Sequence, residues 1–239
     1  MRNLSAAELL DVWERGRLRP SLDQGALLLW LAWPELSWEA LEGMALGRRE
    51  GLLLGLRRRL FGPRLEGLAA CPACGTTVEF DFELPPAAGN PSAEPEALLI
   101  NLSLGQYTLE AMPPAAADLR RAVAEGRPLW ALCLTRLEHA GRPAPVEALP
   151  AEAVAELEDA LQAADPLALI EIGLNCPACG AGWHAALDAA AYLFAELEGW
   201  ARETLWTVGR LAAAYGWSEA ECLALPAWRR GYYLELAER

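Results

Sequence analysis

Apolar residues recur at three- and four-residue steps over both ends of the chain, a period that is typical of amphipathic helices. The pattern predicts helices over residues 5–16, 21–31, 36–41, 46–61, 118–125, 129–139, 151–164, 193–215, 218–225 and 226–236. A serine followed three residues later by a glutamate predicts a capping box at two helix starts. The two pairs are Ser5 with Glu8 and Ser218 with Glu221.

Strict alternation of apolar and acidic residues replaces this period in the middle of the chain. Residues 77–84 read TVEFDFEL, which predicts a half-buried strand. Residues 98–104 and 107–112 are expected to form two strands joined at Gly105-Gln106, and 167–174 and 183–187 two more. The proline-rich stretch 85–95 is interpreted as a loop.

The pentapeptide CPACG occurs twice, at residues 71–75 and 176–180, and each copy lies next to predicted strands. Each copy is a CxxC knuckle, in which a tight turn can direct two thiolates at one metal ion, and the following glycine suits the positive φ of such a turn. One knuckle supplies half of a four-thiolate site. The sequence therefore predicts one site, formed by Cys71, Cys74, Cys176 and Cys179.

Four thiolates bind zinc tetrahedrally and leave no position open for water, which is typical of a structural site. The knuckles are about 100 residues apart, but the entropy of loop closure grows only logarithmically with length. We therefore expect one structural zinc per chain to act as a clasp, an ion that joins two distant segments. Disulfides or redox thiols, the absence of metal, and ligation by His184 in a three-cysteine site are alternatives.

Together these elements predict an α+β fold, mainly α-helical. Helices flank a small antiparallel β region that contains a split four-cysteine zinc ribbon, formed by the two distant CxxC knuckles. The segments are an N-terminal helical part (1–68), the ribbon with its inserted strands and helices (69–188) and C-terminal helices (189–239). We interpret them as one integrated body.

The charge balance limits the classes of partner. The chain has 33 acidic residues against 20 basic ones, all of them arginine, and its net charge of −13 disfavours a phosphate backbone as the main partner. Its apolar runs are shorter than the roughly 20 residues that span a bilayer. The first helix does not resemble a secretory signal, so we expect a cytoplasmic protein, where CxxC pairs bind metal more often than they form disulfides.

Outside the knuckles, the sequence contains few candidate catalytic or metal-binding residues. Cys133 and Cys222 lie in apolar helices and are expected to be small buried residues, while His139 is expected to be solvated. No nucleophile has a histidine near it, so we expect no enzyme. Helix 46–61 carries an arginine-rich face that is either solvated or docks an acidic partner; its members are Arg48, Arg49, Arg57, Arg58 and Arg59.

The C-terminal helices carry more aromatic surface than a short helical hairpin can bury: Trp200, Trp206, Trp217, Trp228, Tyr232 and Tyr233. Part of this surface is expected to pack on residues 1–68. Part is a candidate partner surface, because Trp, Tyr and Arg concentrate binding energy at interfaces, and the alternative is that all six aromatic residues belong to the core. The candidate patch consists of Trp228, Arg229, Arg230 and Tyr232.

Four stretches resemble the bacteriophage base plate protein family of T-even-type contractile-tailed phages, which has relatives in bacterial contractile injection systems. They are residues 46–75, 113–119, 176–180 with 182–201, and 210–237, the last with its Tyr-Gly-Trp-Ser-Glu motif. The resemblance implies a non-enzymatic structural or assembly role at the hub of a contractile baseplate, with baseplate or hub proteins as partners. It does not distinguish a component of the finished particle from an assembly factor.

A second hypothesis from another class is a zinc-ribbon adaptor or regulator that contacts an enzyme or nucleic acid. The acidic charge weighs against nucleic acid, and the resemblance favours the baseplate role.

Overall fold

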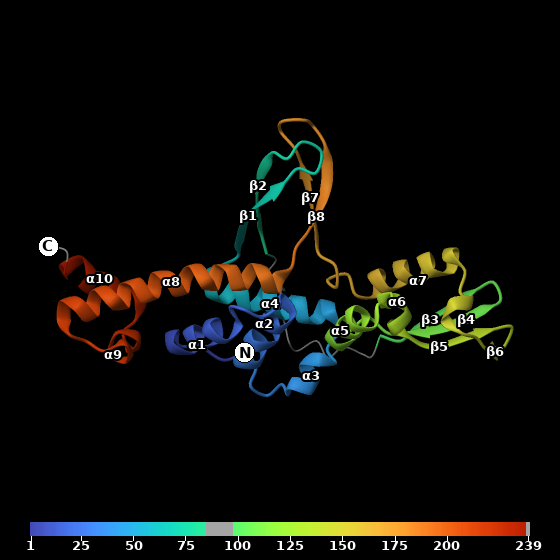
Figure 1. Cartoon of the computed structure of the whole chain (residues 1–239), viewed down its shortest axis with the longest axis horizontal. Helices are drawn as coiled ribbons and strands as arrows, with labels where there is room; N and C mark the ends of the chain where they lie inside the picture. Colours follow the sequence, from blue (N-terminus) through green and yellow to red (C-terminus); the bar gives the residue numbers. More distant parts are fainter. Residues whose placement is uncertain (85–97, 238–239) are drawn as a thin grey trace. The chain divides into compact units, whose positions relative to one another are not determined.

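The computed structural model describes residues 1–84 and 98–237 of the chain, so the predicted loop 85–95 lies outside the described residues. The fold is α+β and mostly helical, with small antiparallel sheets, as predicted (Figure 1). The chain divides into two compact units. Unit 1 contains residues 1–36 and 190–239, and unit 2 contains residues 37–189. This division cuts the predicted N-terminal segment near residue 36 and groups the rest of it with the ribbon.

Unit 1 is helical. Its helices are α1 (Ala6–Gly16), α2 (Ser21–Ala32), α8 (Ala189–Tyr215, from residue 190 onward), α9 (Glu219–Ala224) and α10 (Ala227–Ala237). Both predicted capping boxes are confirmed: the Ser5 and Ser218 side chains accept the backbone N–H groups of Glu8 and Glu221, whose carboxylates bond back to the two serines.

Close packing joins the two ends of the chain in unit 1. A Cβ at Gly16 would lie 2.5 Å from the ring of Phe194, so only glycine allows this approach of α1 to α8. Near the C-terminus, Trp217 stacks on Tyr215 with ring centroids 4.8 Å apart and meets Tyr233 edge-on at 5.0 Å. Helix α8 therefore packs against α1 through Phe194, and part of the C-terminal aromatic surface is internal because its rings pack on one another. Packing of the predicted aromatic side chains on residues 1–68 stays a prediction.

In its described residues, unit 2 combines helices with three small antiparallel sheets. Its helices are α3 (Trp38–Glu42), α4 (Leu46–Phe61), α5 (Ala116–Glu125), α6 (Leu129–Cys133), the 3-10 turn η1 (Val146–Ala148) and α7 (Ala151–Ala164). Its strands are β1 (Arg64–Ala70), β2 (Thr77–Glu83), β3 (Ile100–Leu104), β4 (Tyr107–Ala111), β5 (Leu134–His139), β6 (Arg142–Pro143), β7 (Glu171–Asn175) and β8 (Gly182–Ala186). Among the described residues, β1 pairs with β2, β7 with β8, and the others follow the order β3-β4-β5-β6.

The sequence interpretation starts the strand 167–174 four residues too early, since β7 begins at Glu171, and it misses two longer strands. The predicted helix 129–139 ends at Cys133 and continues as β5, because Leu137 pairs with Leu109 of β4 inside a buried cluster. Strand β1 was not predicted: its sequence RLEGLAA has low strand propensity, and it is extended because it pairs with β2 along its whole length. In both cases tertiary pairing overrides a weak local preference.

An apolar core of unit 2 lies between α7 and strands β3–β5. Its buried members are Leu109, Ala111, Cys133, Leu137, Leu149, Ala153, Leu157 and Leu161. Leu157 and Leu109 are fully buried, which places α7 against the sheet through a continuous apolar contact.

Candidate metal centre

Each knuckle joins the two strands of one hairpin. The first connects β1 to β2, and the second connects β7 to β8. In the first, the Gly75 N–H donates to the Cys71 carbonyl (2.8 Å) and the Cys71 N–H to the Thr76 carbonyl (2.9 Å). Both knuckle glycines have a φ of +75°, a region that favours glycine.

The second knuckle repeats these bonds. The Gly180 N–H donates to the Cys176 carbonyl (2.9 Å), and the Cys176 N–H donates to the Ala181 carbonyl (2.9 Å). The identical pentapeptides thus form the same turn twice, and each turn places its two thiols on one side of its hairpin tip.

The two hairpins lie side by side (Figure 1), and the four predicted cysteines come together. Their Sγ atoms all lie within 4.8 Å of one another. Cys71 Sγ is 3.7 Å from Cys179 Sγ, and Cys74 Sγ is 3.6 Å from Cys176 Sγ. Each close pair joins one knuckle to the other, across 108 and 102 residues of sequence.

These distances fit a metal ion better than disulfides. Four sulfur atoms about 2.3 Å from a central zinc lie about 3.8 Å apart in a tetrahedron. A disulfide requires an S–S distance of about 2.0 Å, and all six cysteines of the chain are free. The four-cysteine cluster can therefore hold a metal ion such as zinc.

In each knuckle the first cysteine is buried and the second is exposed. Cys71 and Cys176 are buried with Val78, against Ala181 and Trp183, whereas Cys74 and Cys179 are exposed. A hydrogen bond with the Thr76 hydroxyl (3.3 Å) lowers the pKa of Cys74 to about 6. The Ala181 N–H lowers the pKa of Cys179, but hydrogen bonds to the neighbouring thiols outweigh it and raise that pKa to about 12. Because the ligands must be thiolates, metal binding is expected to release protons.

The other residues considered from sequence lie elsewhere. His184 lies on β8 opposite Gly173, is exposed and is not part of the four-cysteine cluster. Cys133 and Cys222 are buried, as predicted, and burial raises the pKa of Cys133 to about 12. His139 ends β5 with its ring stacked on Tyr107.

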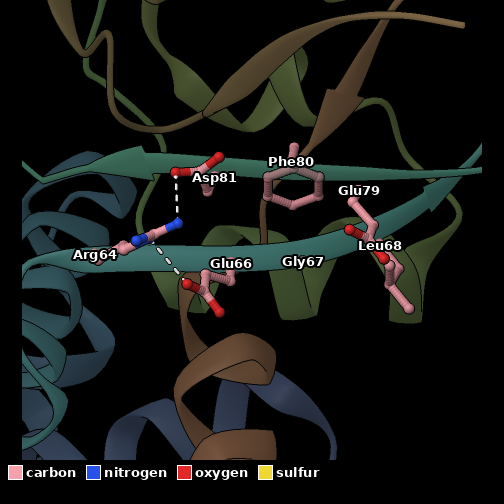
Figure 2. Close-up of a pocket in the computed structure, with 7 residues that line it drawn as sticks. All are labelled: Arg64, Glu66, Gly67, Leu68, Glu79, Phe80 and Asp81. Atoms are coloured by element: carbon pink, nitrogen blue, oxygen red, sulfur yellow. Dashed lines mark ion pairs between the residues drawn. The ribbon is translucent and has the colours of Figure 1, made fainter. Parts of the chain in front are cut away.

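The outer face of the β1–β2 hairpin is acidic. It is hollowed over about 730 Å³ along both strands, and Figure 2 shows Arg64 between two carboxylates there. Arg64 pairs with Glu66 (2.9 Å) and Asp81 (3.2 Å), which face each other across the strands and would otherwise repel. Glu79 and Glu83 share this face, which would repel a nucleic-acid backbone.

Two carboxylates that the sequence did not reveal accept N–H groups at helix starts: Asp165, which is buried, and Glu50, which is half-buried. Asp165 accepts the Gly47 N–H at the start of α4 (2.8 Å), and a Cβ at Gly47 would collide with it. Glu50 accepts the Ala189 N–H at the start of α8 (3.0 Å), and burial raises its pKa to about 7. Both contacts join residues more than 100 positions apart, so local sequence patterns give no signal for them.

The arginine-rich face of α4 is not uniformly solvated. Arg49 and Arg57 are buried, at 1% and 4% exposure, so neither is available to dock a partner, while Arg59 is exposed. Arg57 donates to the Gly62 carbonyl beyond the helix end (2.8 Å). The prediction of a solvated or docking face is therefore wrong for these two residues, because they are used inside unit 2.

The candidate partner patch also needs one correction. Trp228, Arg229 and Tyr232 are exposed, but Arg230 is only 7% exposed. Its guanidinium donates to the Leu225 carbonyl (2.8 Å) just after α9 and lies 3.5 Å from the Leu223 carbonyl. Arg230 therefore holds α9 against α10 and is not part of the surface. A partner role for the other three residues stays a prediction.

Comparisons with known proteins find no protein family, no curated protein and no solved structure that matches this chain. In the described part of the chain, no helix is both long enough and apolar enough to cross a membrane.

Proposed function

We propose that the protein is a non-enzymatic structural or assembly component of a contractile-tail baseplate, and that one structural zinc clasps its two knuckles. The observation that supports the zinc is the cluster of the four Sγ atoms of Cys71, Cys74, Cys176 and Cys179. They all lie within 4.8 Å of one another, and two pairs are 3.6 and 3.7 Å apart, close to the spacing in a zinc tetrahedron. Four protein ligands fill the coordination of zinc and leave no position for water or substrate, so the ion has a structural role.

The baseplate assignment rests on the sequence resemblance of the knuckle regions and of the C-terminal stretch 210–237. Two observations favour protein partners over nucleic acid: the net charge of −13 and the acidic outer face of the ribbon hairpin. Exposed aromatic side chains on α10, with Trp228 at 73% exposure, supply a surface of the kind that binds proteins.

The test of this role is the production of functional contractile particles by cells that lack the gene. We expect the deletion to abolish particle production, the wild-type gene to restore it, and Cys133→Ser to restore it as well. Cys176→Ser should fail to restore it, because it removes a metal ligand. Normal particle yield from the deletion would refute the assembly role.

A pull-down of the tagged protein from assembling cells, compared with purified particles, separates the two hypotheses. The baseplate role predicts baseplate or hub proteins in the first sample, and their presence or absence with the protein in the second distinguishes a component from a transient factor. Recovery of nucleic acid, or sub-micromolar sequence-dependent binding to it at physiological salt, would favour the adaptor.

A further inference from the structure

Helix α10 presents an apolar stripe to solvent. Trp228, Tyr232 and Leu236 follow one another at four-residue steps and are 73%, 60% and 42% exposed. Residues four apart lie on the same face of a helix. Exposed apolar side chains gathered on one face mark an interaction site more often than scattered ones do.

Unit 2 contains an apolar hollow of about 300 Å³ that is open to solvent, which we call the α7 hollow. It lies where α6, α7 and the segment after α7 meet the start of α4. Its walls include Leu129, Trp130, Leu161 and Leu169. Ligand pockets range from about 300 to 1,000 Å³, so a space at the lower limit suits one large side chain better than a cofactor.

The edge of the α7 hollow carries negative charge, whereas the exposed stripe of α10 lies beside a positive charge. Glu158 lies at the edge of the α7 hollow, is exposed, and forms no ion pair with the described residues. Helix α7 also carries Glu152, Glu156 and Asp159 and has no basic residue. On α10, the exposed Arg229 directly follows Trp228, and its guanidinium stacks 6.0 Å from the ring of Tyr233.

We propose that the chain self-associates, with Trp228 of one copy inserted in the α7 hollow of a second copy and Arg229 paired with Glu158. The occupant is a second copy because the same chain carries both an exposed indole beside a cation and an apolar hollow beside an unpaired anion. Such a contact joins two different surfaces, so it is heterologous and each copy keeps one surface free for the next. This inference goes beyond the proposed function, whose partners are other baseplate proteins.

Sedimentation velocity of the metal-loaded, full-length protein over a wide concentration range tests the contact. The variants are Trp228→Ser, which removes the inserted side chain, and Leu169→Glu, which places a charge at the 48%-exposed rim of the hollow. Each is expected to raise the dissociation constant at least about tenfold, as loss of a central interface residue does. Trp206→Ser, which removes another exposed tryptophan (54%), is the matched control and should leave association unchanged.

The heterologous geometry makes a sharper prediction for mixtures. Trp228→Ser keeps its hollow and Leu169→Glu keeps its indole, so an equimolar mixture should form dimers and stop there. At the same total concentration, each variant alone should associate at least about tenfold more weakly than wild type. Growth of the mixture beyond dimers, or failure of the mixture to form dimers while wild type associates, would overturn the proposed contact.

Charge reversal tests the ion pair. Arg229→Glu and Glu158→Arg should each weaken association, and the chain that carries both changes should recover it. A wild-type chain that stays monomeric at all concentrations overturns the proposal. This holds even if α10 is then found to bind a different protein. Unchanged zinc content and circular dichroism in every variant show that the loss is not due to misfolding.

Discussion

Unit 2 contains two antiparallel regions of different construction. We call β1–β2 and β7–β8 with their knuckles the metal module, and β3–β6 with α7 the α7–sheet region. In the metal module, the buried cluster consists of Cys71, Val78 and Cys176. In the α7–sheet region, a larger cluster includes five buried leucines: Leu109, Leu137, Leu149, Leu157 and Leu161.

The two regions are expected to be stabilised by different interactions. An isolated two-stranded hairpin is marginally stable in water, and the two hairpins of the metal module share few apolar contacts. In the cluster between the knuckles, two of the three buried residues are cysteines whose thiols face the other knuckle. We therefore expect coordination to stabilise the metal module and burial of apolar surface to stabilise the α7–sheet region.

The largest effect is expected from loss of the metal. Chelation or Cys176→Ser should abolish amide protection in β1–β2 and β7–β8 and lower the melting temperature strongly, because metal binding to such sites contributes about 10–16 kcal/mol in isolated zinc peptides. Hydrogen exchange should show that β3–β5 keep their protection. The control is Cys133→Ser, since Cys133 and Cys176 are equally buried (3%) but only Cys176 is in the cluster. Equal effects of the two substitutions would contradict the comparison.

The converse substitution is Leu157→Ala in the α7–sheet region. It leaves a cavity at a fully buried side chain, so it should lower the free energy of unfolding by about 2–5 kcal/mol in urea titrations. Zinc content should not change. Loss of metal from this variant would show that the two regions are not independently stabilised.

A smaller effect is expected at Glu50, which is half-buried and whose carboxylate accepts the Ala189 N–H. Its pKa is raised from 4.5 to about 7, so ionisation is unfavourable in the folded chain and stability is lost as pH rises from about 4.5 through 7. Glu50→Gln keeps an oxygen that can accept the Ala189 N–H and removes the charge.

We therefore expect Glu50→Gln to match wild type at pH 4.5 and to exceed it above pH 7, by at most about 3 kcal/mol. Chemical denaturation at a series of pH values measures the difference. Asp188 and Arg49 act on the same carboxyl with opposite signs. A wild-type advantage at pH 8 would show that the Glu50 carboxylate is stabilised there instead.

The smallest expected effect is a difference in unfolding free energy between substitutions at the neighbouring Arg229 and Arg230. Arg230→Met removes the charged hydrogen bond to the Leu225 carbonyl, so it should cost about 1.5–3 kcal/mol of unfolding free energy. Arg229→Met, at an exposed position, should cost less than about 0.5 kcal/mol. Thermal unfolding of the pair measures both, and equal losses would mean that Arg230 is not held as described.

The elements that could be predicted from sequence have local causes. The capping boxes at Ser5 and Ser218 need residues three apart, and the knuckles need five. Convergence of the knuckles was also predictable, because zinc requires four ligands and each copy supplies two.

The elements that sequence missed depend on distant partners. Strand β1 requires β2, β5 requires β4, and Glu50 caps a helix that starts 139 residues later. The burial of Arg49 and Arg57 likewise depends on what packs against α4, which periodicity along α4 does not reveal.

The measurement that tests the clasp most directly is native mass spectrometry of the chain purified without chelator, combined with thiol titration. The account predicts one zinc per monomer. In the metal-bound chain, the thiols of Cys133 and Cys222 should be the ones that react, slowly, as their surroundings unfold. The thiols of Cys71, Cys74, Cys176 and Cys179 should react only after a chelator has removed the metal. A metal-free chain, or one zinc shared by two chains, would contradict a clasp between the two knuckles of one molecule.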